Sequence, residues 1–449
     1  MGKGKIQSAW LIAVLLLVAS GCGAGGGNGG GTGCPPSGTG NLVVNISGLP
    51  GGVNAKVSVT GPSGFNQNLT ASQTFTATAA GTYTVSADKV AQSDPIVRTA
   101  YSASVSDSPA CVRNGQATTV TVSYAQIPSS NKLWLDNGNR PSGSSPLLGF
   151  AASLLGSTAT QSPSVSAGTV NLRDLTFDPD GNLWGIGGTT ADPTLVRYPA
   201  NDLGSSGSKT RDRGINVAGI TCSPGASRLA FDASGNLWVS VPCANKAVRV
   251  SAAQLGASGT VTPAVEITGL NAPEGLAFDA SGNLWIANRG AQRVVRFNAT
   301  RLSASTSDPD LTIESKTPGP VISTLDASLL AFDASGNLWV VAFGANVIYR
   351  LTPSDQSGSG SKTLTPAIQV SIPVEAVLEG LAFDEGGGLW ISYSAGKFAR
   401  LSSAQLATSS TSGSPTTPER IITSASIGSA GGLALYPAPA GLPLYHKLP

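Results

Sequence analysis

The stretch Leu276-Ala-Phe-Asp-Ala-Ser-Gly-Asn-Leu-Trp285 decides the fold, because it recurs through the second part of the chain. Near-identical or looser copies occupy residues 175–184, 229–238, 330–339 and 381–390. Each copy contains two short apolar runs joined by Asp-x-x-Gly. This pattern is typical of a tight turn, since Asp bonds to the backbone two residues on and Gly tolerates a positive φ. The stretch therefore predicts a β-hairpin.

Pairing outward from the turn predicts which side chains face each other in this hairpin. If Asp279 and Asn283 flank the turn, Phe278 pairs with Leu284, and the next pair brings residue 277 opposite the tryptophan. An indole ring needs room beside its cross-strand neighbour. This explains why the middle position of the first strand is small in every copy: Thr176, Ala230, Ala277, Ala331 and Ala382.

The spacing of the repeats predicts a β-propeller. Six tryptophans, at positions 134, 184, 238, 285, 339 and 390, are 47 to 54 residues apart, which suits four-stranded blades. Trp134 precedes the first complete repeat, whereas Leu433-Ala-Leu-Tyr436 has no tryptophan after it. We therefore expect six blades, the last of which is shared between the two ends of this region and spares the ring two free sheet edges.

A different pattern precedes the repeats. Short alternating strands between residues 41 and 128 are separated by turn signals such as Pro50-Gly51-Gly52, which predicts a small antiparallel β-sandwich. The segment resembles the Ig-like or carboxypeptidase-regulatory-like modules of exported bacterial proteins. The predicted fold class is therefore all-β, with an Ig-like sandwich at 41–128 and a six-bladed propeller at 131–449.

The N-terminal segment predicts export and lipidation. Residues 1–21 contain two lysines, an apolar run and small residues, as a signal peptide does. The apolar run is shorter than the about 20 residues that a membrane-spanning helix needs. Ala19-Ser20-Gly21-Cys22 resembles a bacterial lipobox, in which the cysteine is acylated and becomes the mature N-terminus; an ordinary secretory signal is the alternative. By that resemblance, Gly23 in place of Asp favours the outer membrane over the inner one.

Residues 22–40 are rich in glycine and predict a flexible tether. Without Lys3 and Lys5 the basic residues number 25, equal to the acidic ones, so the mature chain has no long-range attraction to nucleic acid.

Besides Cys22, four cysteines remain, which an oxidising compartment would convert into two disulfides. The register of the second hairpin brings Cys243 near Cys222, and elimination then pairs Cys34 with Cys111.

Residues 287–297, with the sequence ANRGAQRVVRF, are similar to the loop and third strand of an NHL repeat. The repeat region as a whole resembles the NHL, SMP-30 and Vgb-lyase group of six-bladed propellers. This resemblance implies a fold and no single activity, because any function can be built on the hairpin. The sole histidine, His446, lies in the C-terminal tail, so a Vgb-type lyase would lack its base.

Candidate functional residues lie where the blades differ. The start of the first strand and the end of the second share one face, opposite the Asp-x-x-Gly turns, because the two strands are antiparallel. The turn aspartates recur in every copy and are interpreted as turn residues. The predicted binding residues on the opposite face are Arg173, Asp174, Arg228, Glu274, Asn288, Arg289, Glu379 and Tyr393.

Two functions fit these residues. The first is a monomeric lipoprotein, anchored at the surface or in the periplasm, whose propeller binds a protein or glycan without a cofactor. The second follows from the resemblance to SMP-30-like lactonases, which implies a calcium or magnesium ion held by Asp174, Glu274, Asn288 and Glu379 in a lactonase or related hydrolase. A salt-bridged rim without a metal is the alternative for the same side chains. The absence of a complete catalytic set in the sequence favours binding.

Overall fold

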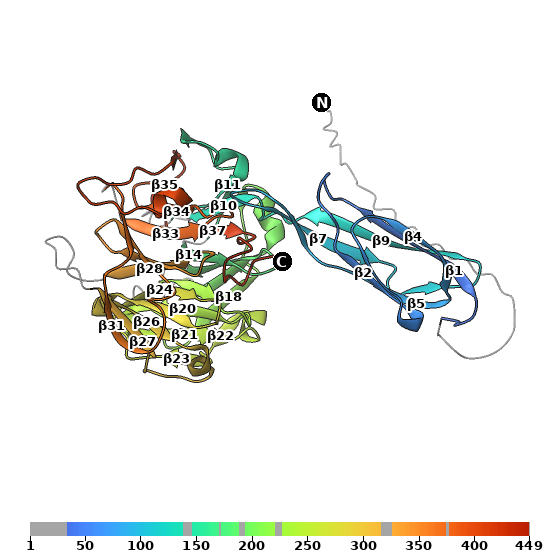
Figure 1. Cartoon of the computed structure of the whole chain (residues 1–449), viewed down its shortest axis with the longest axis horizontal. Helices are drawn as coiled ribbons and strands as arrows, with labels where there is room; N and C mark the ends of the chain where they lie inside the picture. Colours follow the sequence, from blue (N-terminus) through green and yellow to red (C-terminus); the bar gives the residue numbers. More distant parts are fainter. Residues whose placement is uncertain are drawn as a thin grey trace, which may run out of the picture.

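The computed structural model describes residues 34–137, 146–169, 172–187, 194–220, 227–315, 326–373 and 377–448. Within these ranges the chain is almost entirely β-structure, a sandwich followed by a propeller (Figure 1). The predicted all-β fold class is therefore confirmed. Cys22, Cys222 and the export segment lie outside the described residues. In the described part of the chain, no helix is long and apolar enough to span a bilayer.

Two sheets form the sandwich around a core that includes Leu42, Val57 and Tyr83. One sheet has the order β4-β1-β9-β7-β6 and the other β3-β2-β5-β8. The strands are β1 (Thr39–Ser47), β2 (Val57–Thr60), β3 (Asn66–Leu69), β4 (Gln73–Ala79), β5 (Gly81–Ala87), β6 (Val90–Gln92), β7 (Thr99–Ser106), β8 (Ala110–Val112) and β9 (Ala117–Gln126).

One feature of the sandwich differs from the expected antiparallel arrangement. The first strand β1 and the last strand β9 run parallel, from Asn41 beside Ala117 to Ser47 beside Ser123. The remaining strand pairs of the sandwich are antiparallel in the described structure. Cys34 and Cys111 form a disulfide with a Cα separation of 5.5 Å, as predicted, and join the segment before β1 to β8.

The propeller consists of six sheets whose first strands contact one another in a closed ring, β14, β19, β24, β28, β33 and β37. From the axis outward, the first blade contains β14 (Leu172–Phe177), β15 (Leu183–Gly187), β16 (Leu195–Tyr198) and β18 (Arg213–Val217), and the second contains β19 (Leu229–Phe231), β20 (Leu237–Val241), β21 (Lys246–Val250) and β23 (Val265–Ile267). The third blade contains β24 (Pro273–Phe278), β25 (Leu284–Asn288), β26 (Arg293–Phe297) and β27 (Leu311–Ser315), and the fourth contains β28 (Ala327–Phe332), β29 (Leu338–Ala342), β30 (Val347–Leu351) and β32 (Ile368–Ser371). The fifth blade contains β33 (Leu378–Phe383), β34 (Leu389–Tyr393), β35 (Lys397–Leu401) and β36 (Arg420–Thr423), and the sixth contains β37 (Leu433–Tyr436), β10 (Lys132–Asp136), β11 (Pro146–Ala151) and β13 (Val165–Gly168).

Short segments add to this plan. Four outer strands pair in parallel with a strand from the following blade, which covers an otherwise free edge. These added strands are β12 (Ala159–Thr160), β17 (Gly207–Ser208), β22 (Gly259–Val261) and β31 (Gly360–Leu364). The helical segments are α1 (Ser403–Leu406) and the 3-10 turns η1 (Pro62–Gly64), η2 (Ala152–Leu154), η3 (Ala200–Gly204), η4 (Pro242–Ala244), η5 (Gln254–Gly256), η6 (Arg289–Ala291) and η7 (Ala299–Ser303).

The last blade is closed as the sequence predicts. The C-terminal strand β37 pairs antiparallel with β10, which places Ala434 beside Trp134. The repeated hairpin also has the expected register, with Phe278 beside Leu284 and Ala277 beside Trp285. Hydrophobic pattern and turn chemistry therefore fix both the hairpin and the ring closure.

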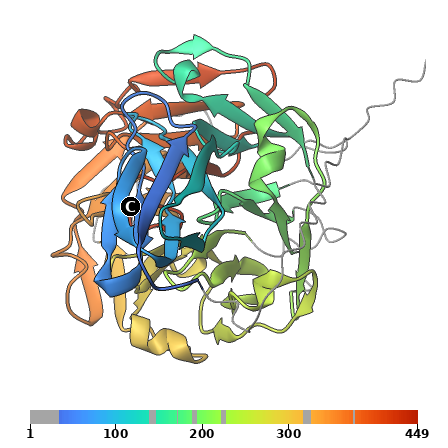
Figure 2. The ribbon, with the colours of Figure 1, turned by 90° about the vertical axis from the view of Figure 1, so that its right-hand side faces the viewer.

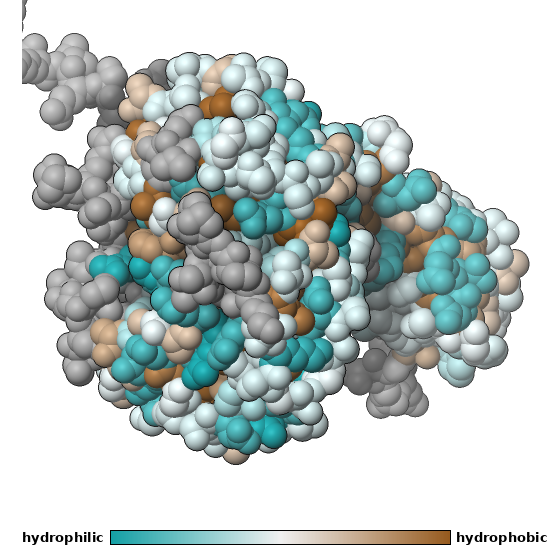
Figure 3. All heavy atoms as spheres, turned by 60° about the vertical axis from the view of Figure 1, so that its left-hand side comes forward, coloured by the Kyte–Doolittle hydropathy of each residue, from teal (hydrophilic) through white to brown (hydrophobic). Residues whose placement is uncertain are grey.

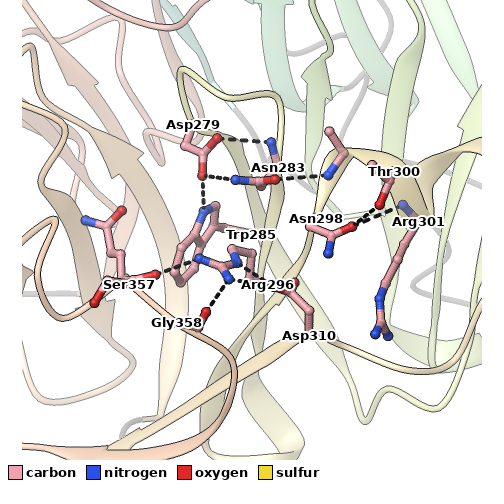
Figure 4. A network of polar contacts seen from close by, with 12 residues as sticks. Asp279, Asn283, Trp285, Arg296, Asn298, Thr300, Arg301, Asp310, Ser357 and Gly358 are labelled. Atoms are coloured by element: carbon pink, nitrogen blue, oxygen red, sulfur yellow. Dashed lines mark hydrogen bonds and ion pairs between the residues drawn. The ribbon is translucent and has the colours of Figure 1, made fainter.

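The turn aspartates stabilise the hairpins, as expected from their recurrence. Asp279 accepts hydrogen bonds from the backbone N–H of Ser281 at 2.9 Å and of Asn283 at 3.0 Å. Its second oxygen accepts from the indole N–H of Trp285 at 3.0 Å (Figure 4). The guanidinium of Arg296 lies 5.5 Å from the centre of that indole. The recurrent aspartate, tryptophan and arginine therefore form one structural unit in this blade.

The sandwich packs against part of the face that carries the Asp-x-x-Gly turns, here the turn face. Lys89 binds the carbonyl oxygen of Pro179 at 2.9 Å and the carboxylate of Asp180 in the turn of the first blade. The carbonyl oxygen of Pro95 accepts from the N–H of Gly386 in the turn of the fifth blade, at 2.8 Å. Figure 2 shows the blue sandwich strands in front of the ring of blades.

The C-terminal tail, residues 437–448, lies between the sandwich and the propeller. Arg98 of the sandwich is almost fully buried, donates to the carbonyl oxygen of Ala438 at 2.8 Å and pairs with Glu385 at 3.2 Å. The rings of Tyr445 and Phe231 lie 5.2 Å apart, so the tail packs on the inner strand of the second blade. The sandwich, the tail and the propeller are thus joined at the turn face.

Candidate functional site

Equivalent positions in successive blades meet around the propeller axis on the side opposite the turn face, here the rim face. The residue two positions before the repeated leucine varies among the blades between arginine, serine, glutamate and glycine, and five of these positions line one cavity of about 200 Å³. The cavity is lined by Arg173, Ser227, Arg228, Pro242, Glu274, Ser328, Phe343, Leu378 and Glu379. Four predicted binding residues, Arg173, Arg228, Glu274 and Glu379, are therefore brought together.

Ion pairs connect these side chains. Arg228 lies 3.5 Å from Glu379, across the axis from its own blade. Arg289, also predicted, donates to Glu274 at 2.6 Å and lies 3.4 Å from Asp326. The rim thus contains charges of both signs that largely neutralise each other.

Burial changes the proton affinity of several of these groups. It raises the pKa of the Glu379 carboxyl, and the charge of Glu274 adds to this effect while Arg228 opposes it. Burial also raises the pKa of Asp174, whose carboxylate accepts from the N–H of Leu229 at 3.0 Å. The pKa of Arg173 is lowered by burial and by the nearby charge of Arg228. These shifts reflect a mouth that is shielded from water.

Phe343 is a rim residue that the sequence argument did not identify. It is 36% exposed, one of two large hydrophobic residues in the described structure that are this accessible. The guanidinium carbon of Arg289 lies 3.4 Å from the centre of its ring. Phe343 occupies the position in its blade that Arg289 holds in the preceding blade. The available signal was an aromatic residue directly after a second strand, where the other blades carry glycine, proline or a polar residue.

Besides Asp174 and Arg289, two further predicted binding residues do not line the rim cavity. Asn288 is buried, and its side-chain oxygen accepts from the backbone N–H of Asn271 at 2.7 Å. Tyr393 is buried beside Lys397, whose ammonium lies 5.2 Å from the ring centre. Burial raises the pKa of the Tyr393 hydroxyl far above its usual range. Both positions stabilise the ends of their second strands.

The four residues predicted as metal ligands are not assembled as one group. Asp174 binds a backbone N–H, Glu274 binds Arg289, and Asn288 binds its neighbouring loop. Within the described ranges, no three Asp, Glu, His or Cys side chains lie close enough together to hold a metal ion. Cys243 is disulfide-bonded; its predicted partner Cys222 lies outside the described residues, so that pairing stays a prediction.

A second cavity, here the chamber, lies on the propeller axis between the rim and the tail. It has a volume of about 160 Å³ and is lined by the first strands of the blades and by tail residues from Ala438 to His446. Arg228 and Glu379 border both cavities. The chamber is therefore bordered by rim residues at one end and by the tail at the other.

His446 is held in the tail at the closed end of the chamber. It is buried, and its ring centre lies 6.1 Å from that of Phe177 and 6.4 Å from that of Tyr436. Burial lowers the pKa of this imidazole to about 4, against the effect of a hydrogen bond with the backbone of Leu435. The side chain is neutral near pH 7 and packs as an aromatic residue.

We expect acid to destabilise the propeller through His446. Its pKa is about 4 in the folded chain and 6.5 when unperturbed, so the unfolded chain binds the proton more tightly. Its contribution is complete above pH 6.5 and is lost as the pH falls through that value towards 4, by about 3 kcal/mol in total. Urea unfolding from pH 4 to pH 7 measures this slope, and His446→Phe should flatten it. The same pH dependence in both proteins would contradict this assignment.

The fold and the rim together define a six-bladed β-propeller with a charged axial mouth. A scan against protein-family models finds no match, and a search of curated proteins finds none either. Among solved structures, a catalytically inactive variant of virginiamycin B lyase from Staphylococcus aureus with quinupristin is 17% identical, covers 52% of this chain and 67% of that chain, and has a TM-score of 0.37.

Two other solved structures are comparably distant. A protein from Lactobacillus plantarum is 13% identical, with 65% of this chain and 82% of that chain covered and a TM-score of 0.44. A nidogen/laminin complex is 13% identical, with 68% and 97% covered and a TM-score of 0.43. At these values the likenesses carry no information on function, and the propeller assignment rests on the pairing of the strands.

Proposed function

We propose that this chain is a lipid-anchored protein of the bacterial cell envelope, whose propeller binds a protein or glycan at the rim face. One observation supports this most: the sandwich and the tail pack on the turn face, whereas the rim face carries the residues that vary among the blades. In chain order the sandwich lies between the proposed anchor and the propeller, which leaves the rim face available to a partner. Figure 3 shows this side of the propeller, where hydrophilic and hydrophobic residues are interspersed.

The rim offers two kinds of contact to a partner. Phe343 supplies an exposed aromatic surface, and aromatic residues are frequent anchors in protein interfaces. Glu274, Arg173 and Arg228 supply hydrogen-bonding groups around the 200 Å³ cavity, which is large enough for one side chain or one sugar ring. Because Arg289 already pairs with Glu274 and Asp326, it supports the ring of Phe343 without needing a partner of its own.

Lipidation is tested by labelling cells with radioactive palmitate. We expect the label in the wild-type protein and its loss in Cys22→Ala, because acylation requires the thiol of the lipobox cysteine. Cys34→Ala is the matched control, since Cys34 is bonded to Cys111 and should leave the labelling unchanged. Equal labelling of the wild type and Cys22→Ala would remove the anchor from the proposal.

Binding at the rim is tested with glycan arrays and with envelope extracts passed over the immobilised mature chain. We expect Phe343→Ala to weaken a specific interaction by tenfold or more, as loss of a central aromatic anchor does. Lys56→Ala is the control, because Lys56 forms an exposed ion pair with Asp88 on the sandwich. A ligand bound equally well by wild type and Phe343→Ala, or one lost with Lys56→Ala, would place binding elsewhere.

The alternative, a metal-dependent lactonase or hydrolase, receives less support from this geometry. Its candidate carboxylates at Asp174, Glu274 and Glu379 each contact a backbone N–H or an arginine. The alternative requires one tightly bound calcium or magnesium ion that is lost in Glu274→Gln or Glu379→Gln. Elemental analysis of protein purified without chelator distinguishes the two functions, since a stoichiometric ion with that dependence would favour the enzyme.

A further inference from the structure

We propose that the chamber is a binding site for a compact apolar molecule, about the size of a substituted benzene ring, that carries an uncharged hydrogen-bond acceptor at one end. The apolar part would lie on the propeller axis, and the acceptor would lie beside Arg228 at the mouth. This site adjoins the rim surface offered to a macromolecular partner and shares Arg228 and Glu379 with it, but it does not depend on the identity of that partner.

The walls of the chamber are predominantly apolar. Leu276 and Phe278 keep 7% and 6% of their surface accessible, whereas Leu284 of the adjoining second strand keeps none. The same first-strand leucine and phenylalanine recur in blades two to five and line the chamber in each case. Because these side chains are otherwise enclosed by the blades, their accessible surface faces the axis.

The tail covers the end of the chamber that lies towards the turn face. Leu442, Tyr445 and His446 lie at its closed end. Leu442 is almost fully buried in a cluster with the fourth and fifth blades, and Arg98 of the sandwich binds the tail backbone at Ala438. The tail therefore lies between the chamber and the turn face.

The size of the chamber limits the ligand. Its volume is about 160 Å³. Apolar cavities of roughly 150 Å³ in proteins exclude water and bind benzene. A single aromatic ring or a short branched alkyl group fits this space, whereas a peptide or an oligosaccharide does not.

The mouth determines the polar part of the ligand. The Nε of Arg228 is buried and has no hydrogen-bond partner in the described structure, although an arginine donor left unpaired in this way is costly. A carboxylate on the ligand would meet Asp174 and Glu379, and an ammonium group would meet Arg228 itself. An uncharged acceptor such as a carbonyl oxygen satisfies the arginine without either repulsion.

Three probes of similar size test this preference: acetophenone, toluene and benzoate. We expect acetophenone to bind the mature wild-type chain at one site, as measured by ligand-observed NMR titration at pH 7. Toluene should bind about tenfold more weakly, because it lacks the hydrogen bond to a charged donor. Benzoate should bind more weakly than acetophenone, because its charge faces the two carboxyl groups at the mouth.

Two variants locate the site. Leu330→Phe enlarges a chamber-lining side chain and should weaken both acetophenone and toluene by tenfold or more. Arg228→Met should remove the preference for acetophenone over toluene and leave toluene binding intact, which keeps the test valid if Leu330→Phe does not fold. Failure of acetophenone to saturate up to its solubility, or unchanged affinities in both variants, would overturn the proposal. Loss of rim binding in Phe343→Ala with intact acetophenone binding would separate this site from the proposed function.

Discussion

A chain that ends at Gly432 should fail to form a closed, stable propeller. This truncation removes β37, whose Tyr436 ring is fully buried 5.4 Å from that of Phe177 and donates its hydroxyl to the carbonyl oxygen of Pro179 at 2.8 Å. Full burial of one large apolar side chain is worth roughly 1.5–3 kcal/mol, so losing this strand and the tail approaches the about 5–15 kcal/mol by which a folded protein is stable. The exposed edge of β10 would also promote association.

Thermal unfolding followed by tryptophan fluorescence, together with size-exclusion chromatography, measures this effect. We expect the truncated chain to lose its cooperative transition and to aggregate. A peptide of residues 431–448 added in trans should restore part of the transition by pairing with β10, whereas a scrambled peptide should not. A truncated monomer that unfolds at the wild-type temperature would show that ring closure contributes little.

Local chemistry explains why the repeated hairpin and the closing blade could be predicted. The register of Ala277 beside Trp285 follows from strand alternation outward from a turn that Asp279 fixes. Ring closure follows from counting the strands of the repeats. The C-terminal end of the repeat region holds a first strand with no tryptophan strand after it, and the N-terminal end holds a tryptophan strand with no first strand before it. Neither step requires knowledge of contacts between distant blades.

The missed elements lack such local signals. The outer strands β22 and β31 are largely exposed and have no apolar alternation, because they pair only at the edge of the preceding blade. The parallel pairing of β1 with β9 joins the two ends of the sandwich, which no turn specifies. The tail belongs to no repeat, so its position across the axis could not be inferred from the periodicity.

The candidate site was predictable by position and less so by side-chain direction. Strand polarity correctly placed Arg173, Glu274 and Glu379 at one end of the axis. However, β24 contains a register shift between Pro273 and Leu276, and equivalent shifts occur at the same end of other first strands. A bulge changes which residues face the cross-strand neighbour. This explains why position alone did not show that Asn288 and Tyr393 turn away from the cavity.

The fifth blade shows a local change that alters the role of its repeated arginine. In the other complete repeats the arginine lies over the indole ring, as Arg296 does over Trp285. Gly388 replaces the usual asparagine here, and a Cβ at that position would lie 2.2 Å from the Arg400 guanidinium. Arg400 therefore reaches the turn and binds Asp384 directly, with an Nε to carboxylate distance of 2.5 Å.

Asp384→Ala should be among the most destabilising single substitutions in the described chain. The buried carboxylate also accepts from the indole N–H of Trp390 at 2.9 Å and the N–H of Gly388 at 2.8 Å, while Glu419 is a second, more exposed partner of Arg400. Removing one partner of a buried ion pair costs about 3–5 kcal/mol, and each buried donor left unpaired adds about 1–3 kcal/mol.

Urea unfolding should therefore show a large loss of stability for Asp384→Ala and a smaller one for Asp384→Asn, which keeps an acceptor for the turn. Asp308→Ala is the matched control, because the exposed pair of Asp308 with Arg301 should contribute at most about 1 kcal/mol. In the double variant with Arg400→Met, part of the loss should be recovered, because the buried charge of Arg400, which Asp384→Ala leaves with Glu419 alone, is then absent. Equal losses in Asp384→Ala and Asp308→Ala would show that the buried carboxylate does not stabilise the fifth blade.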